Sequence, residues 1–468
     1  MTYQYDAGGN PTRISTRRVP VASPPPPPCP GGTCLPPNSA DPVIENGGSD
    51  PTTINQIIEF QSAFIDYDEL GRPRARRGNH NQNFEYEYDG NGNVSEITDS
   101  LGRTTLYDYD ALNRLELITD PNLGKTHYEY DSADRVTKVT APSPISAPIS
   151  TTYKHDGFGQ LWESSSPDTG TIKFQYDAYG RLEWMKRADL VRTDYVHDAL
   201  GRIQTVQPGG TNGPIQSFTY DSCTNGKGRV CKVQDPSGTS EYEYTAHGLV
   251  SKVGTTFNDA NGTLLGSGVQ IYEYDSLGRL KEVHGTSAPH ELVYSYTGGK
   301  LSKVAYTDSS GVATTLADAF DYEPFGPVIG FTYGNGFKRT MEYDNDGRRT
   351  LSKVGLGATI VQDVSYAWDT NNLMDVLTDS LYPNQTQDFG YDALGRLTSV
   401  ASTSGNRAFT YDANGNRKTH TIGTAQTTYT TTPGTNRLSS LSGGTSRGYA
   451  YDSNGNVKAI TGVNAATY

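Results

Sequence analysis

A tyrosine-aspartate signature recurs along almost the whole chain, with a spacing of roughly 21 residues between its copies. In its fullest form it reads Tyr-Asp-x-x-Gly-Arg-Leu, as at 274–280 and 391–397. A unit this short cannot bury an apolar face alone, so a fixed spacing of this size predicts stacked, mutually dependent units. About twenty copies, clear and degraded, can be recognised. The signature therefore predicts a repeat protein and argues against separate compact enzyme domains.

Each unit is predicted to contain two strands and two turns. Phe84, Tyr86 and Tyr88 illustrate the aromatic residues, spaced two apart, that precede each Tyr-Asp pair. Such residues lie on one face of a strand and favour strand structure. Asp-x-x-Gly predicts a type I turn in which Asp accepts backbone N–H bonds and Gly adopts a positive φ. The positions expected to shape the repeats are Tyr67, Asp68, Gly71, Arg72, Tyr88, Asp89, Gly92, Tyr176, Asp177, Gly180, Arg181, Tyr274, Asp275, Gly278, Arg279, Tyr391, Asp392, Gly395, Arg396, Tyr411, Asp412, Gly415, Tyr451, Asp452 and Gly455.

The composition predicts how these hairpins assemble. Only 34% of the residues are hydrophobic, and the mean hydropathy is −0.61, which suits a sheet with one wetted face. Roughly forty strands cannot stay flat, because strand twist accumulates across a sheet. We therefore expect an all-β fold in which tandem β-hairpins form one spiralling, curled sheet. The expected divisions are a partial first repeat at 1–18, a Pro-, Gly- and Asn-rich insert at 19–53, and the hairpin array at 54–468.

The insert contains five consecutive prolines at 24–28. Its composition predicts an extended or disordered connection, and a docking site for a proline-binding partner is the alternative.

Charge and motif content exclude several functions. The net charge of −13 argues against nucleic acid as a partner, because phosphate binding needs clustered Lys and Arg. No apolar run approaches the roughly 18 residues that a membrane span requires. The stretch from Asp89 to Asn93 resembles the start of a calcium loop, but Ser100 stands where the bidentate Glu belongs. His155 and His197 occupy aromatic strand positions and are interpreted as substitutes for Tyr. No catalytic residue, metal site or cofactor is predicted.

The four cysteines form two local pairs. Cys223 and Cys231 flank an enlarged turn, and Cys29 and Cys34 bracket Pro-Gly-Gly-Thr. Both spacings allow disulfides, which suit an oxidising compartment, whereas no second Cys-x-x-Cys or His cluster supports a metal site. The chain begins without a signal peptide and both ends fall within repeats, so a fragment of a longer protein is expected.

The segments 274–280 and 391–397 resemble the signature of the Rhs, or YD-repeat, family. That family includes bacterial Rhs proteins, wall-associated polymorphic toxins, the C component of Tc toxins and animal teneurins. The resemblance implies a hollow, spiralling shell, secreted or at the cell surface, that encloses a C-terminal toxin. It also implies the toxin cargo or the remainder of the shell as partners. The family's Asp-Pro-x-Gly-Leu core motif is absent, since Asp235 to Gly238 is followed by Thr239, so no self-cleaving residues can be assigned.

The leading hypothesis is therefore a non-enzymatic structural shell segment that encapsulates or presents a toxin. The alternative is a cell-surface adhesion or carbohydrate-binding module that contacts a glycan or a protein through exposed aromatic residues such as Tyr272. A self-cleaving aspartyl protease is the third and least supported hypothesis.

Overall fold

The computed structural model describes residues 2–5, 11–18, 58–142, 148–210, 213–286, 290–324, 326–444, 446–462 and 466–467. The insert predicted at 19–53, together with Cys29 and Cys34, lies outside the described residues. Among the residues that are described, none belongs to a helix that could cross a bilayer.

One sheet of 39 strands contains nearly all the regular structure of the described residues. Each strand pairs antiparallel with the next strand along the chain, so the sheet is a single continuous meander. The predicted all-β fold of tandem hairpins is confirmed. The elements are β1 (Thr2–Tyr5), β2 (Pro11–Arg18), β3 (Ile58–Tyr67), β4 (Pro73–Arg77), β5 (Asn83–Tyr88), β6 (Val94–Thr98), β7 (Thr104–Tyr109), β8 (Leu115–Thr119), β9 (Lys125–Tyr130), β10 (Val136–Thr140), β11 (Ser150–His155), β12 (Leu161–Ser166), β13 (Gly170–Tyr176), β14 (Leu182–Lys186), β15 (Arg192–His197), β16 (Ile203–Pro208), β17 (Gln216–Tyr220), β18 (Val230–Asp235), β19 (Gly238–Tyr244), β20 (Val250–Asn258), β21 (Leu264–Tyr274), β22 (Leu280–Gly285), β23 (Glu291–Thr297), β24 (Lys300–Thr307), β25 (Ala313–Tyr322), β26 (Val328–Tyr333), β27 (Lys338–Tyr343), β28 (Arg349–Leu356), β29 (Thr359–Trp368), β30 (Met374–Asp379), the 3₁₀ helix η2 (Pro383–Gln385), β31 (Gln387–Tyr391), β32 (Leu397–Ala401), β33 (Arg407–Tyr411), β34 (Arg417–Ile422), β35 (Ala425–Thr431), β36 (Leu438–Gly443), β37 (Arg447–Tyr451), β38 (Val457–Gly462) and β39 (Ala466–Thr467).

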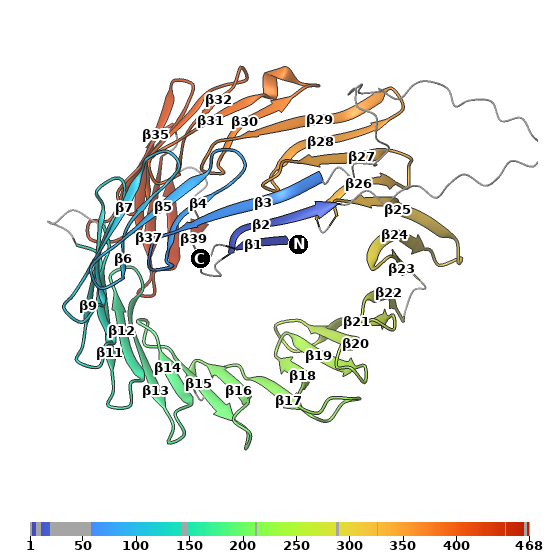
Figure 1. Cartoon of the computed structure of the whole chain (residues 1–468). Helices are drawn as coiled ribbons and strands as arrows, with labels where there is room; N and C mark the ends of the chain where they lie inside the picture. The colour runs from blue at the N-terminus through green and yellow to red at the C-terminus, as the bar shows by residue number, and fades with distance from the viewer. Residues whose placement is uncertain are drawn as a thin grey trace, which may run out of the picture.

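A register shift at the repeat tyrosine gives the sheet its curl. In the hairpin β5–β6, Tyr86 pairs with Ile97 but Tyr88 pairs with Val94, so the register changes just before the turn. The same shift occurs at the last residue before the turn in many other hairpins. A bulge at a repeated place increases the right-handed twist there each time. The sheet consequently winds into a spiral (Figure 1).

Two kinds of turn alternate along the spiral. Repeat turns carry the Tyr-Asp signature or its variants and join the two strands of a hairpin, and return turns join one hairpin to the next. Strands β4–β15 are called the first coil and strands β27–β38 the second coil. Hydrogen bonds between the two coils join residues 264 to 290 positions apart. These bonds link the return turns of the first coil to the repeat turns of the second coil.

The bonds between the coils are made by carboxylates and amides at the turns. Asp346, in the repeat turn between β27 and β28, accepts bonds from the Asn79 backbone N–H and the Gln82 side-chain amide, both at 2.9 Å. Farther along the same contact, Asp168 accepts a bond of 2.6 Å from the Asn436 N–H. The Asn454 amide donates to Asp189 at 2.5 Å. The rim of the first coil that carries its return turns is therefore bonded to the rim of the second coil that carries its repeat turns.

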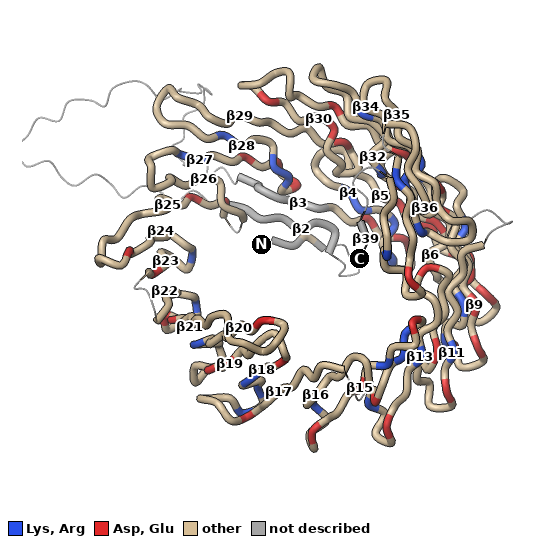
Figure 2. The backbone as a smooth tube through the Cα atoms, turned by 180° about the vertical axis from the view of Figure 1, so that it is seen from behind, with Lys and Arg blue, Asp and Glu red and all other residues tan. Residues whose placement is uncertain are grey.

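The described residues contain few fully buried side chains. The buried apolar residues are Ala75, Ile149, Cys231, Met341, Val354 and Val364. Basic and acidic residues are distributed along the whole ribbon instead of gathering in one patch (Figure 2). Stability must therefore come largely from contacts between neighbouring hairpins, as expected for repeat proteins.

Candidate functional site

The repeat turn is built around its aspartate. In the turn between β13 and β14, one carboxylate oxygen of Asp177 accepts bonds from the N–H groups of Tyr179 (2.9 Å) and Arg181 (3.0 Å). The other oxygen accepts a bond of 2.7 Å from Nε of Arg181. Gly180 has a φ of 79°, the left-handed conformation that a glycine adopts at little cost. The aspartate therefore fixes both the turn and the direction of the arginine.

The same arrangement recurs although the residues vary. Where the arginine is replaced by asparagine, Asn93, Asn416 and Asn456 donate amide bonds to their own turn aspartates at 2.9 to 3.0 Å. Where the glycine is replaced, Asn113 keeps a φ of 62°, which asparagine tolerates better than most residues. The carboxylate–arginine pairs are Asp68–Arg72, Asp110–Arg114, Asp131–Arg135, Asp177–Arg181, Asp198–Arg202, Asp275–Arg279, Asp344–Arg348 and Asp392–Arg396.

The repeat tyrosine connects its own repeat to the preceding one. The Tyr130 hydroxyl donates to the carbonyl of Leu115, the first residue of the second strand in the preceding hairpin, at 2.7 Å. Trp368 replaces tyrosine in one copy, and its indole N–H donates to the Arg349 carbonyl at 2.8 Å. The equivalent tyrosine bonds are Tyr88–Pro73, Tyr109–Val94, Tyr176–Leu161, Tyr220–Ile203, Tyr244–Val230, Tyr274–Val250, Tyr296–Leu280, Tyr322–Leu301, Tyr343–Val328, Tyr391–Met374, Tyr411–Leu397 and Tyr451–Leu438.

The repeat arginine connects its repeat to the following one. Arg396 donates from Nη1 to the Asp412 carbonyl at 2.8 Å, and its guanidinium lies 5.0 Å from the centre of the Tyr411 ring. Arg114 makes the same pair of contacts with the Asp131 carbonyl (3.0 Å) and the Tyr130 ring (4.7 Å). We call the tyrosine bond and the arginine contacts together the inter-repeat clamp. Stacking of the repeat arginines on tyrosine rings was expected from the sequence, whereas the bonds from tyrosine and arginine to backbone carbonyls of neighbouring repeats were not.

The contacts of the repeat turn and of the clamp shift the pKa values of an aspartate and a tyrosine away from neutrality. Hydrogen bonding from the Arg181 side chain lowers the pKa of Asp177 to about 2. Burial raises the pKa of the Tyr176 hydroxyl. These two groups therefore keep one protonation state near neutral pH, as a structural contact requires.

The disulfide Cys223–Cys231 closes the enlarged repeat turn between β17 and β18, with a Cα–Cα distance of 5.4 Å. This turn lies against the next repeat, because the Asn225 amide donates to the Tyr244 carbonyl at 2.8 Å. Gly226 lies inside the loop, where an added Cβ would come within 2.4 and 2.5 Å of the two sulfur atoms. The disulfide predicted for this pair is thus present.

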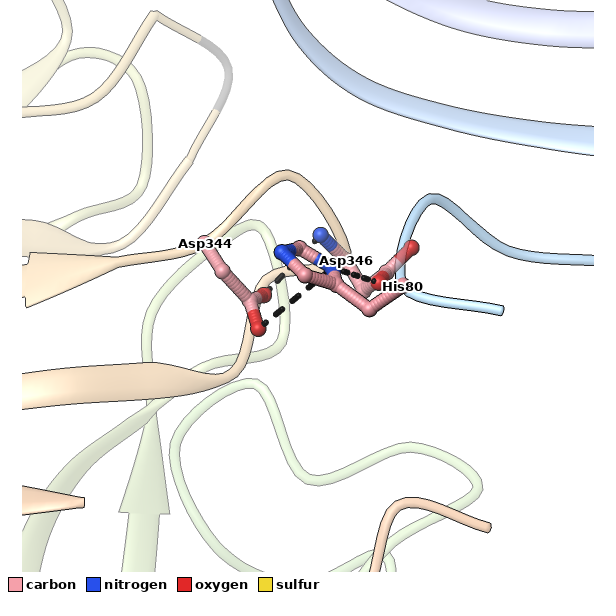
Figure 3. Close-up of side chains that lie close together, drawn as sticks. All are labelled: His80, Asp344 and Asp346. Atoms are coloured by element: carbon pink, nitrogen blue, oxygen red, sulfur yellow. Dashed lines mark hydrogen bonds and ion pairs between the residues drawn. The ribbon is translucent and has the colours of Figure 1, made fainter. Parts of the chain in front are cut away.

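His80, Asp344 and Asp346 form a cluster at the contact between the coils (Figure 3). Nδ1 of His80 lies 2.5 Å from Asp346 and 3.9 Å from Asp344. The Asp344 carboxylate already accepts a bond of 2.7 Å from Nε of Arg348. Asp346 likewise accepts the bonds from Asn79 and Gln82 described above. The position of these three side chains is therefore explained by the hydrogen bonds and ion pairs that join the two coils.

An aromatic groove of about 820 Å³ lies across β12, β13 and β14. It is lined by Trp162 and Trp184, and by the exposed rings of Phe158 and Tyr179 from two adjacent repeat turns. This groove was not predicted, because its residues come from three strands and two repeat turns that meet only in the folded sheet. Tyr272, the aromatic residue singled out from sequence, is half-buried on β21, and its hydroxyl donates to the Gln270 side chain at 2.9 Å.

Comparison with known proteins assigns the architecture to a family. The RHS Repeat model matches residues 67–104, 88–123, 117–143 and 391–429, and the Teneurin YD-shell model matches residues 164–312. The chain belongs to the Rhs/YD-repeat family.

Solved structures share this YD-repeat fold. The Photorhabdus luminescens Tc holotoxin pore aligns with a TM-score of 0.73 at 14% identity, over 86% of this chain and 24% of that chain. The TcdB2–TccC3 structure aligns with a TM-score of 0.63 at 14% identity, over 86% of this chain and 27% of that chain.

A curated relative is also similar in sequence. Double-stranded DNA deaminase toxin A of Burkholderia cenocepacia (strain H111) is 28% identical over 275 residues, which are 49% of this chain and 18% of that protein. The YD-repeat chain thus spans about a quarter or less of each of these longer proteins.

Removing one clamp hydroxyl should destabilise the array measurably. We expect Tyr130→Phe to lower the free energy of unfolding by about 1 kcal/mol, because the bond to the Leu115 carbonyl is lost. Tyr128→Phe is the matched control, since Tyr128 lies two residues earlier on the same strand and no described hydrogen bond involves its hydroxyl. Urea unfolding followed by circular dichroism measures both variants. Equal losses in the two variants would contradict the assigned role of the tyrosine bond.

The turn aspartates should make the protein sensitive to acid. The pKa of Asp177 is about 2 in the folded chain and 3.8 ordinarily, so its stabilising contribution is present above about pH 3.8 and is lost as the pH falls towards 2. We expect the melting temperature to fall through this window. In Asp177→Asn, which cannot titrate, that fall should be smaller. An unchanged pH profile in the variant would contradict the role of the carboxylate.

Proposed function

We propose that this chain is a non-enzymatic structural segment of a YD-repeat shell, which encapsulates or presents a C-terminal toxin for delivery to target cells. The single observation that carries the proposal is the contact between the coils, which turns a winding ribbon into a continuous curved wall. Each internal strand is paired on both sides, so few open strand edges remain for unwanted pairing. The clamp adds stiffness, because each hairpin is bonded to both of its neighbours.

Other features agree with this role. Most repeat aspartates are committed to a turn and to an arginine or asparagine partner, whereas Asp156 and Asp369 accept backbone N–H bonds of their own turns. The matches to a Tc holotoxin and to a DNA deaminase toxin associate the fold with toxin proteins. We infer a secreted or cell-surface location and, as partners, the toxin cargo or the rest of the shell. We also propose the division into a first repeat at 1–18, an insert at 19–53 and the array at 54–468.

Opening the contact between the coils should expose the cargo. In the full-length gene product, we expect Asp168→Ala combined with Asp346→Ala to increase the rate at which an added protease digests the cargo, because bonds at two separate places along the contact are lost. Asp259→Ala is the matched control, since Asp259 accepts bonds only within its own return turn. Gel electrophoresis over time measures the digestion. A cargo digested equally fast with and without the array would refute encapsulation.

A second candidate function is carbohydrate binding, and the aromatic groove favours it. Aromatic rings pack against the apolar faces of sugars, and Lys173 and Gln175 offer hydrogen-bond donors beside Trp162 and Trp184.

We expect any glycan bound by the groove to be lost in Phe158→Ala combined with Tyr179→Ala, because both rings line the groove. The variant should still fold, since both rings are highly exposed and contribute no core packing. A glycan array, followed by calorimetry on any hit, measures the binding. Tyr382→Ala, an exposed aromatic residue elsewhere, is the control. Absence of any hit with the unmodified protein would reject this candidate.

A further inference from the structure

In several hairpins a pair of opposite charges joins the two strands at one fixed position. The pair consists of the residue just before the repeat tyrosine, or before its variant, and the residue opposite it on the following strand. In three hairpins one of the two is a glutamate and the other a lysine, with 2.8 Å between nitrogen and oxygen; the pairs are Glu129–Lys138, Lys154–Glu163 and Glu243–Lys252. A cation therefore lies beside the glutamate at this position in those hairpins.

The hairpin β21–β22 carries two glutamates at this position. Glu273 stands directly opposite Glu282, and like charges that face each other across two strands destabilise a sheet. Lys281 approaches Glu273, with its Nζ 3.4 Å from Oε2. Within the part of the chain that the structure describes, no lysine or arginine forms an ion pair with Glu282, whose charged partner is His284. The glutamate pair therefore lacks a cation between its two members.

His284 adds a nitrogen ligand beside the two carboxylates. It follows Glu282 by two residues and so lies on the same face of β22. Its Nε2 lies 3.8 Å from Oε1 of Glu273 and 4.0 Å from Oε1 of Glu282, and the three ligand atoms all lie within 4.8 Å of one another. Ligand atoms around a tetrahedral Zn²⁺ are about 3.4 Å apart, because each bond is about 2.0–2.2 Å long. Small side-chain rotations therefore bring all three atoms to bonding distance of one ion.

The cluster is shielded on one side and open on the other. The side chains of Glu282 and His284 are 18% and 24% exposed, whereas that of Glu273 is 47% exposed. Lys281 contacts Oε2 of Glu273 and His284 faces Oε1, so one oxygen remains available for an ion. Glu291, opposite His284 on β23, adds a third acidic residue to the same face. An ion can therefore reach the cluster from solvent, and the surrounding acidic residues favour a cation.

We propose that Glu273, Glu282 and His284 bind one Zn²⁺ ion, which joins β21 to β22. One imidazole and two carboxylates are ligands that zinc accepts, whereas Ca²⁺ and Mg²⁺ prefer oxygen ligands alone. A water molecule completes the tetrahedral coordination. The ion takes the place that lysine has in the other hairpins, as the cation between two strands. This site is independent of whether the chain encloses a toxin.

The hairpin β5–β6 shows what the histidine contributes. Glu87 faces Glu96 at the same position, but the residue two places after Glu96 is Thr98, so no nitrogen ligand is present. We expect no zinc binding there.

The cluster of His80, Asp344 and Asp346 differs in another way. Its carboxylates already accept bonds from Arg348, Asn79 and Gln82. Its oxygen atoms are therefore used by the contact between the coils, and we expect no zinc binding there either.

Isothermal titration calorimetry with zinc chloride tests the proposal on the 468-residue chain, prepared without a histidine tag and freed of metal with a chelator. We expect one ion per chain. His284→Thr, which introduces the residue found at Thr98, should weaken binding at least tenfold, and Glu282→Gln should do the same. Glu87→Gln and His80→Asn are the matched controls, and both should bind zinc like the unmodified chain.

Thermal unfolding separates metal binding from an ordinary stabilising contact. Excess zinc should raise the melting temperature of the unmodified chain but not that of His284→Thr. Without metal, Glu282→Gln should melt no lower than the unmodified chain, because it removes a like-charge contact. Circular dichroism establishes that the variants fold.

Three results would overturn the proposal. One is an unmodified chain that binds no zinc. Another is equal affinity in His284→Thr and the unmodified chain. The third is loss of binding in His80→Asn, which would assign the ion to the contact between the coils.

Discussion

The structure depends first on the hydrogen bonds that each turn aspartate accepts from the backbone N–H groups of its own turn. One oxygen of the carboxylate closes the turn, and the other holds the arginine four residues later, as in Asp177 and Arg181. That arginine reaches the next repeat, where it meets a carbonyl and a tyrosine ring. A local contact within five residues therefore determines a contact between hairpins, and the hairpin contacts repeated along the chain determine the wall.

This hierarchy explains how a polar chain with few buried side chains can form a large, stable sheet. A compact domain relies on one apolar core, whereas here each hairpin contributes a similar set of contacts with its two neighbours. Degenerate copies are tolerated because different residues serve the same geometry. Trp368 replaces a tyrosine and keeps the bond to the preceding repeat, and Asn416 replaces an arginine and keeps the bond to its aspartate.

The sequence predicted what depends on short spacings. The strand–turn–strand unit, the roles of Asp and Gly in the turn, the curled all-β sheet and the Cys223–Cys231 pair all follow from residues fewer than about 25 positions apart. The contact between the coils could not be predicted, because Gln82 and Asp346 are 264 residues apart and neither belongs to a shared motif. The partners of the tyrosine hydroxyls were missed because they are backbone carbonyls, which carry no sequence signal.

The spacing of the contacts between the coils has a consequence for how such arrays can change in length. Asn79 meets Asp346 and Asp189 meets Asn454 after 267 and 265 residues, so one revolution holds a nearly constant amount of chain. Loss or duplication of a single hairpin between them would advance every later turn by one place, and each polar group would face the wrong neighbour. A fixed amount of chain per revolution is therefore what keeps the polar groups of the two coils opposite their partners.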